Sequence, residues 1–230
     1  MITSRREFLK TSGAGAVLAG AAWAAEPGLQ KGRRPNIVLF VTDDQSDAGC
    51  YGNTVVKTPA LDRLAAEGIR FTHAFCTTPS CSPSRSVILT GRHNHATGQY
   101  GLAHPYHHFV SFENQATLPK LLQDSGYRTI HAGKFHVAPK ETFAFEEFFN
   151  FEFKDHKTSI DMAEAIQPVI EKEDNRPFFL YFCTREPHRP FQRSHADPVN
   201  PGDVRVPPFL PDTGECRKEL AEYHMSCQEA

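Results

Sequence analysis

Hydrophobic and polar positions divide the chain into short apolar runs and longer amphipathic segments. Residues 36–42 and 177–183 are continuous apolar runs, which are typical of strands that are buried on both faces of a sheet. Residues 128–132 form a third predicted strand. Helical segments separate these strands, and the alternation predicts an α/β fold with a doubly wound, largely parallel sheet.

The predicted helices are bounded by residues that favour helix ends. Residues 58–68 begin with Thr-Pro and end with Gly, which suit the N-cap, the first helical position and the C-terminal stop. Residues 117–124 form a second such helix, closed by Gly126. The other expected elements are a strand over 69–74, a helix over 159–173 that Pro168 kinks or splits, a proline-rich loop over 197–211 and a helix over 217–228.

The first residues have the features of an export signal. Ser4-Arg5-Arg6-Glu7-Phe8-Leu9-Lys10 resembles the twin-arginine motif, and Ala22-Trp23-Ala24 is a small-x-small cleavage site. The weakly apolar stretch between them is too short and too rich in glycine to form a stable membrane anchor. The alternative is a basic, disordered N-terminus. The expected organisation is a signal peptide over 1–24, a linker over 25–34 and a catalytic region over 35–230, exported by the twin-arginine machinery to the periplasm or beyond.

Composition narrows the class of protein. The chain is 40% hydrophobic and 23% charged, as in soluble globular proteins. Its formal net charge of −2 implies no general affinity for nucleic acid or for anionic membranes. The chain has six cysteines, and an oxidising destination would permit disulfides, but their pairing cannot be read from spacing.

The segment around Cys81 is the most informative one. Pro83 has the fixed φ that suits a first helical turn, so residues 84–89 are expected to form a helix that buries its last three apolar side chains. Cys81 would then lie just before a helix N-terminus, where unpaired N–H groups favour an anion. Arg85 adds a planar charge suited to a tetrahedral oxyanion. The alternative is an ordinary loop cysteine beside a surface arginine.

Polar residues follow each of the three predicted strands. Asp43-Asp44, Lys134 with His136, and His188 come after the first, second and third strand in turn. Because the carboxyl ends of parallel strands meet at one edge of a sheet, we expect these side chains to lie close together.

Each of these groups has two interpretations. Paired carboxylates suit Ca²⁺ or Mg²⁺, but Asp is equally common in turns and caps. Lys134 and His136 could be an exposed lysine and a hydrogen-bonded histidine, and His188 an ordinary loop residue. Zinc is not indicated, because His93-x-His95 and His107-His108 lack the companion spacing of zinc ligands.

Taken in order, these segments resemble the type I sulfatases. Cys81-x-Pro83-Ser84-Arg85, followed by apolar residues and Thr-Gly, is similar to the first signature of that family, and residues 126–136 are similar to the second. The resemblance implies an alkaline-phosphatase-like catalytic domain that hydrolyses sulfate esters or sulfamates. It also implies a formylglycine-generating enzyme as a partner, which converts Cys81 to formylglycine.

The resemblance further implies a role for each matching residue. The implied catalytic residues are Cys81, Arg85, Lys134, His136 and His188, and the implied ligands of Ca²⁺, with Mg²⁺ as the alternative, are Asp43, Asp44 and Cys81 as formylglycine. The formylglycine hydrate would attack sulfur while Arg85 and Lys134 stabilise the sulfuryl oxygens. His136 would assist the hydrate, and His188 would protonate the leaving group.

Within the family, several segments are similar to the sulfamidases, the heparan N-sulfatases. They are Tyr100-Gly101-Leu102, His107-His108-Phe109, Gly133-Lys134-Phe135-His136-Val137, Pro187-His188-Arg189 and residues 206–211. This similarity implies N-sulfoglucosamine of heparan-type glycans as the sulfated carbohydrate substrate, with His107, His108 and Arg189 as candidate sugar contacts. Phe135 departs from the basic residue expected there.

Two alternatives remain beside this interpretation. One is a phosphonate or phosphate ester hydrolase of the same superfamily, since some of those enzymes also use formylglycine. The other is an inactive, truncated binding module, because the resemblance places further metal ligands and a smaller C-terminal domain beyond Ala230.

Overall fold

The computed structural model describes residues 34–151, 158–191 and 196–230. The chain divides into two units, residues 1–34 and 35–230. The predicted signal peptide over 1–24 and nearly all of the linker over 25–34 lie outside the described residues. None of the helices in the described part is long and apolar enough to cross a membrane.

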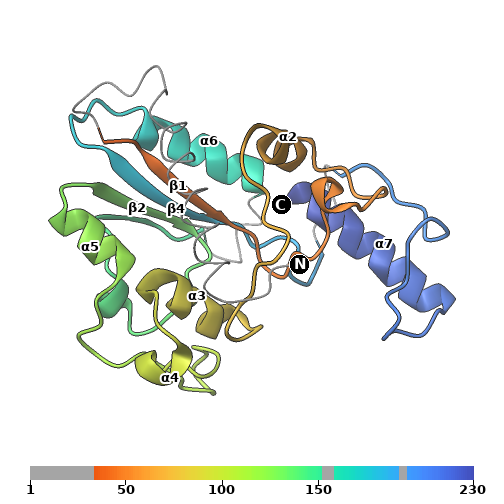
Figure 1. The fold of residues 1–230 in the computed structure, drawn as a ribbon, viewed down its shortest axis with the longest axis horizontal. Helices are drawn as coiled ribbons and strands as arrows, with labels where there is room; N and C mark the ends of the chain where they lie inside the picture. The colour runs from red at the N-terminus through yellow and green to blue at the C-terminus, as the bar shows by residue number, and fades with distance from the viewer. Residues whose placement is uncertain (1–33, 152–157, 192–195) are drawn as a thin grey trace, which may run out of the picture. The chain divides into compact units, whose positions relative to one another are not determined.

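Four parallel strands form one sheet in the order β1-β4-β2-β3 (Figure 1). They are β1 (Ile37–Val41), β2 (Arg128–Gly133), β3 (Glu147–Phe149) and β4 (Phe178–Cys183). β4 pairs with both β1 and β2, so segments far apart in the sequence lie side by side in the sheet. Parallel strands connected through helices confirm the predicted α/β fold.

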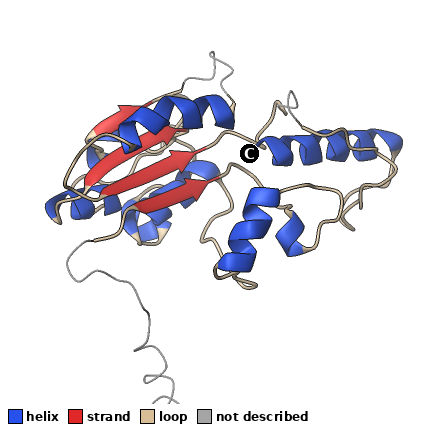
Figure 2. Ribbon diagram, turned by 90° about the horizontal axis from the view of Figure 1, so that it is seen from above, coloured by secondary structure: helices blue, strands red, loops and turns tan. Residues whose placement is uncertain are grey.

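Some helices of the described residues lie on the two faces of this sheet, and others, including α7, lie beyond the ends of its strands (Figure 2). The helices are α2 (Pro59–Glu67), α3 (Cys81–Thr90), α4 (Asn94–Thr97), α5 (Leu118–Asp124), α6 (Ser159–Ile170) and α7 (Gly214–Glu229), with 3-10 turns η1 (Gly49–Tyr51) and η2 (Lys140–Phe143). Pro168 does not split α6, which continues to Ile170. α7 begins three residues before the predicted start, because the Thr213 hydroxyl accepts a hydrogen bond from Cys216 N at 3.2 Å.

Alternate residues of β4 enter two hydrophobic cores, one on each face of the sheet. The core on the α3 and α5 face contains Leu89, Tyr127, Val137, Phe143, Phe179, Tyr181 and Cys183. The core on the α6 face contains Ile130, Ala132, Met162, Ile166, Leu180 and Phe182. β2 and β4 are therefore buried on both faces and form a rigid platform for the loops that follow them.

Two strand predictions differ from the structure. The first strand is not buried on both faces, since β1 lies at the sheet edge, where Val38 is 58% exposed and Phe40 44% exposed. Residues 69–74 do not form a strand, because no strand of the described residues offers their backbone a pairing partner. Ile69 and Phe71 are left 83% and 66% exposed. The short strand β3 was not predicted.

Candidate active site

The loops after β1, β2 and β4 meet at one edge of the sheet and are joined by backbone hydrogen bonds. Asp43 N donates to Glu186 O at 3.0 Å, and Lys134 N donates to Cys183 O at 2.9 Å. These bonds fix the first residues after the three strands relative to one another. This edge is the usual position of ligand sites in open α/β sheets.

Asp43 lies at the centre of a buried charge cluster formed with Arg85 and Lys134. Its Oδ1 is 3.3 Å from Arg85 Nη2, and its Oδ2 contacts the Lys134 ammonium group. All three side chains are buried, with 3% of Asp43, 3% of Arg85 and 7% of Lys134 exposed. One carboxylate faces two cations, so the cluster carries an excess positive charge that favours a further anion.

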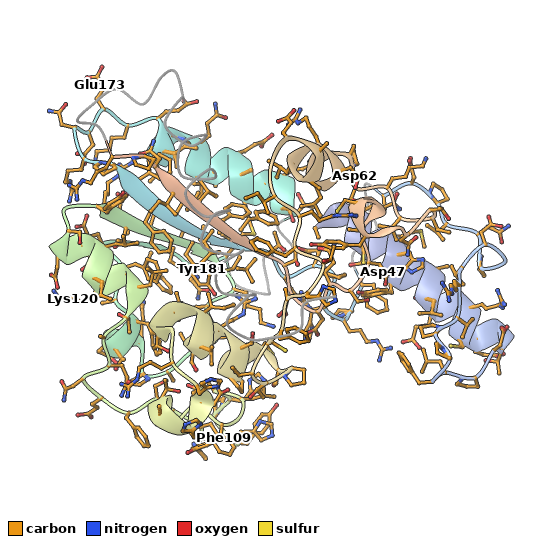
Figure 3. All side chains as sticks on the ribbon, viewed as in Figure 1. Asp47, Asp62, Phe109, Lys120, Glu173 and Tyr181 are labelled. Carbon is orange, nitrogen blue, oxygen red and sulfur yellow. The ribbon has the colours of Figure 1, made fainter. Side chains whose placement is uncertain are left out.

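Arg85 is held from a second side. Its Nη1 donates to Lys134 O at 3.0 Å and approaches the Tyr181 hydroxyl at 3.5 Å. Burial opposes the charge of Arg85, but Tyr181, Cys183 and Asp43 together raise its pKa above the usual value. The guanidinium group therefore stays charged in the folded protein. Figure 3 labels Tyr181 beside the sheet, on the side where α3 lies.

Cys81 is the first residue of α3, so the helix begins three residues earlier than predicted. Ser80 has extended backbone angles, and Pro83 fits the first turn because its missing N–H has no helical acceptor there. Cys81 is a partly buried free thiol. Arg85 follows one turn later on the same side of the helix. The prediction that the last three apolar residues would be buried is correct for Leu89, whereas Ile88 is 38% exposed.

His136 faces the cluster in a form that can accept a proton. Burial, followed by the nearby Lys134, His104 and Arg85, lowers its pKa to about 4. The ring is therefore neutral at pH 7. His104 packs against it, with 4.6 Å between the ring centroids. The left-handed φ of 52° at His136 turns the chain sharply just after Lys134.

Asp44 and His188 form the exposed side of the site. His188 Nε2 is 3.9 Å from Asp44 Oδ2, and the His188 Nδ1–H donates to Arg189 O at 2.6 Å. Ligand atoms of Asp43, Asp44 and His188 all lie within 4.8 Å of one another. Carboxylate oxygens at this spacing fit a hard divalent cation, but they supply only part of the six to eight ligands that Ca²⁺ takes.

The three candidate sugar contacts have different surroundings. His107 packs near His104, with 5.7 Å between ring centroids, and so lies beside the His136 side of the site. Arg189 pairs with Glu219 of α7 and lies over the Phe191 ring, at 5.4 Å from its centroid. His108 is exposed and has a left-handed φ of 55°.

Several residues that shape the site were not found from the sequence. They are Asn94, Gln99, His104, Tyr181 and Tyr223, which hold or contact the predicted residues through bonds between distant segments. A histidine-rich loop was the only signal for His104. Tyr181 was indistinguishable from a core residue within its apolar run.

Comparison with known proteins identifies relatives of this chain. Residues 35–204 match the model of the sulfatase family. Human N-sulphoglucosamine sulphohydrolase is 33% identical over 229 residues, covering 84% of this chain and 44% of the relative. An N-acetylglucosamine-6-O-sulfatase of Bacteroides thetaiotaomicron is 31% identical over 188 residues, covering 72% and 33%. The chain thus spans less than half the length of these two relatives.

A solved structure gives the same result for the fold. BT4656, determined in complex with its substrate D-glucosamine-2-N,6-O-disulfate, superposes with a TM-score of 0.58 at 29% identity, covering 72% of this chain and 36% of that one. The predicted fold class is thereby confirmed for the part of the domain that this chain contains.

Proposed function

The chain belongs to the sulfatase family, and from that premise we propose that it carries the nucleophile-bearing part of an enzyme that hydrolyses N-sulfoglucosamine in heparan-type glycans. The observation that carries the proposal is the buried cluster of Asp43, Arg85 and Lys134 beside the first turn of α3. Fixed positive charge next to a helix N-terminus is suited to hold a sulfuryl group and to stabilise charge that develops on it.

The nucleophile of this proposal is residue 81. As formylglycine, it would supply through its hydrate one hydroxyl to attack sulfur and a second to release the sulfate. Arg85 and Lys134 would orient the sulfuryl oxygens, since both are charged, buried and held by Asp43. The neutral His136 ring would accept a proton from the attacking side. His188, when protonated, would donate from Nε2 to the departing oxygen or nitrogen.

Asp43 and Asp44 would hold Ca²⁺, or Mg²⁺ in its place, together with an oxygen of residue 81, and the ion would offset charge on the sulfuryl group. The test is the melting temperature with and without millimolar Ca²⁺. The double variant Asp43→Ala/Asp44→Ala should lose the stabilisation by Ca²⁺, whereas Asp203→Ala, an exposed carboxylate in the 197–211 loop, should keep it. An unchanged response in the double variant would exclude this metal site.

The substrate is proposed from the relatives. One is a sulphohydrolase of N-sulphoglucosamine, another acts on N-acetylglucosamine 6-O-sulfate, and BT4656 binds a doubly sulfated glucosamine. All three names describe a sulfated glucosamine, and the first favours the sulfamate. Attack at sulfur does not itself distinguish S–N from S–O cleavage, so the choice depends on groups that bind the sugar.

The experiment uses the protein produced together with a formylglycine-generating enzyme. Peptide mass spectrometry should find formylglycine at position 81, and sulfate release should be followed with N-sulfoglucosamine, N-acetylglucosamine 6-O-sulfate and a phosphate monoester in parallel. Release from N-sulfoglucosamine alone supports the proposal. Release only from the O-sulfated sugar would remove the sulfamidase assignment, and turnover of the phosphate ester alone would favour a phosphoester hydrolase. Formylglycine without any turnover would favour the binding module.

Export of the protein is proposed from its first 24 residues, which have the twin-arginine pattern. Residues 1–24 fused to a reporter that folds in the cytoplasm should direct it across the membrane. Replacing Arg5 and Arg6 with Lys should abolish that transport, and a reporter that remains exported would exclude the twin-arginine route.

A further inference from the structure

A buried amide that the proposed mechanism does not use holds the first turn of α3. Asn94, the first residue of α4, is only 8% exposed. Its Oδ1 accepts from the Thr77 and Thr78 hydroxyls at 2.9 and 2.8 Å. Its Nδ2 donates to Pro83 O and Gln99 O, at 2.9 Å in each case. A side-chain amide offers two donors and two lone pairs, so Asn94 is fully bonded.

These hydrogen bonds lie on both sides of position 81. Thr77 and Thr78 precede it, and Pro83 follows it, so a single side chain ties the two arms of the turn that carries the reacting atom. We infer that Asn94 is a positioning residue that fixes residue 81 at the start of α3, on the same side as Arg85. The inference rests on the proposed function only in taking residue 81 as the reacting position.

The start of α3 has no side-chain capping hydrogen bond of its own. Ser80 occupies the N-cap position of α3, but its side chain makes no capping hydrogen bond. Such a bond from Ser normally stabilises a helix start. Asn94 holds this turn in a different way, through the Pro83 carbonyl and the hydroxyls of Thr77 and Thr78. Ser82 Oγ adds a further bond by accepting from Ala103 N at 3.0 Å.

The same scaffold extends to the loop that carries His104. Gln99 is fully buried, and its Nε2 donates to Gly101 O and Phe109 O at 2.8 and 3.0 Å. The Asn94 side chain donates to the Gln99 carbonyl. The buried side chains of Asn94 and Gln99 therefore connect the turn before α3 with the loop that carries His104, which packs against His136. Loss of Asn94 would therefore loosen residue 81 first and this loop second.

The test uses the thiol of the protein produced without a maturation enzyme. Iodoacetamide labelling of each cysteine, resolved by peptide mass spectrometry, compares Cys81 with Cys183, which is fully buried and reports global unfolding. Labelling is carried out over a time in which Cys183 of the parent protein stays unlabelled. Asn94→Ala should raise the labelling rate of Cys81 about fivefold or more, because the released turn exposes this thiol without unfolding of the domain. Cys183 should stay unlabelled over the same time.

Matched variants separate positioning from general destabilisation. Asn53→Ala removes an amide that also makes several hydrogen bonds, to Asp47 Oδ1 and from the N–H groups of Val55 and Val56, at 2.7 to 3.0 Å. It should leave the labelling of Cys81 unchanged.

The threonine side of the tie is tested separately. Thr77→Val/Thr78→Val removes only the bonds before position 81 and should raise the Cys81 rate by less than Asn94→Ala does. Adding the two threonine substitutions to Asn94→Ala should not raise the labelling rate of Cys81 further, since all three residues belong to one hydrogen-bond network.

In the formylglycine form, Asn94→Ala should lower kcat at least about tenfold while KM changes less than about twofold, because misplacement of a reacting group acts on the chemical step. Cys81 labelling that is unchanged, that rises in parallel with Cys183, or that rises equally in Asn53→Ala would overturn the inference. If the enzyme shows no sulfatase activity, labelling still decides the positioning question, so the two proposals fail independently.

Discussion

Two adjacent carboxylates after β1 lie in opposite environments. The Asp43 side chain is 3% exposed and contacts two cations. The Asp44 side chain is 60% exposed, and its Oδ2 lies 3.9 Å from His188 Nε2. The backbone of Asp44 has a left-handed φ of 66°. Asp43 belongs to the sheet region, which consists of the four strands with α3 to α6. Asp44 begins the outer region, which consists of residues 44–80 and 196–230.

The outer region contributes no residue to the two hydrophobic cores, although single apolar side chains such as Val56, Val204 and Ala221 are buried in it. α2 buries no residue, and Leu64, Ile69 and Phe75 are 62%, 83% and 91% exposed. Polar contacts also hold its parts, such as those around Asp47, which Figure 3 labels beside α7. Two apolar cores and buried charge thus fix one half of the site, while single buried side chains and hydrogen bonds fix the other. We therefore expect local opening to concentrate in the outer region.

The largest effect is expected from a matched pair of carboxylate variants. Asp43→Asn leaves the buried Arg85 and Lys134 without a counter-charge, and should lower the free energy of unfolding by about 3–5 kcal/mol. Asp44→Asn removes an exposed charge and should cost less than about 1 kcal/mol. Urea unfolding in the presence of EDTA measures both without a metal contribution. Equal losses of unfolding free energy in the two variants would show that the burial of Asp43 does not make its charge more important for stability than that of Asp44.

A pair of leucine variants tests the packing side of the same contrast. Leu89 of α3 is fully buried in the core between this helix and the sheet. Leu89→Ala should therefore lower the free energy of unfolding by about 3–4 kcal/mol, through lost contacts and a cavity. Leu64 on α2 is 62% exposed, and Leu64→Ala should change stability by less than about 0.5 kcal/mol. A cost of more than about 2 kcal/mol for Leu64→Ala would mean that the outer region packs more tightly than its exposure indicates.

The two central strands of the sheet were predicted accurately, for a physical reason. Residues 128–132 and 177–183 carry a strong strand signal because β2 and β4 are buried on both faces. The residues after each strand were expected to lie close together because parallel strands end at one edge of a sheet, whereas the roles of these residues and of Cys81 were implied by the resemblance to sulfatases. Residues 69–74 have the composition of a strand but no partner among the described strands, and partners cannot be read from a single segment.

The supporting residues of the site could not be predicted for a related reason. Asn94 bonds four residues across a span of 77 to 99, and Tyr223 bonds residues 44 and 46 from the last helix. Their residue types carry no local signal, since Asn also occurs in turns and Tyr in cores. Only the folded chain shows which distant polar groups meet.

Acid should weaken the sheet region through His131. Burial lowers the pKa of His131 to about 3, from about 6.5 in the unfolded chain. Between these two values only the unfolded chain binds the proton. The stability of the fold is therefore unaffected by His131 above pH 6.5 and decreases as the pH falls toward 3. The loss is about 2–3 kcal/mol between pH 6.5 and 4.5. His131→Phe, which keeps a ring stacked on Phe148, should flatten the stability profile over that range.

The matching histidine of the outer region is His224. Burial lowers its pKa as well, but Asp47 opposes the shift, so His224→Phe should flatten the profile less than His131→Phe does. Urea unfolding at half-unit pH intervals measures both slopes. A steeper slope after His131→Phe, or a larger flattening from His224→Phe, would contradict the assignment of acid sensitivity to the sheet region.

The smallest expected effect concerns the hydroxyl that attaches α7 to the loop of Asp44. Tyr223 OH accepts from Ser46 N at 2.7 Å and donates to Asp44 O at 3.0 Å, so Tyr223→Phe should cost about 1 kcal/mol. Tyr51→Phe, which loses one exposed bond to Phe71 O at 3.2 Å, is the matched control and should cost less. Hydrogen exchange should show faster exchange of the Ser46 amide in Tyr223→Phe, with the β4 amides unchanged, because the bond holds the outer region and not the sheet. Faster exchange throughout β4 would instead mean that this hydroxyl stabilises the whole domain, and that the two regions open as one unit.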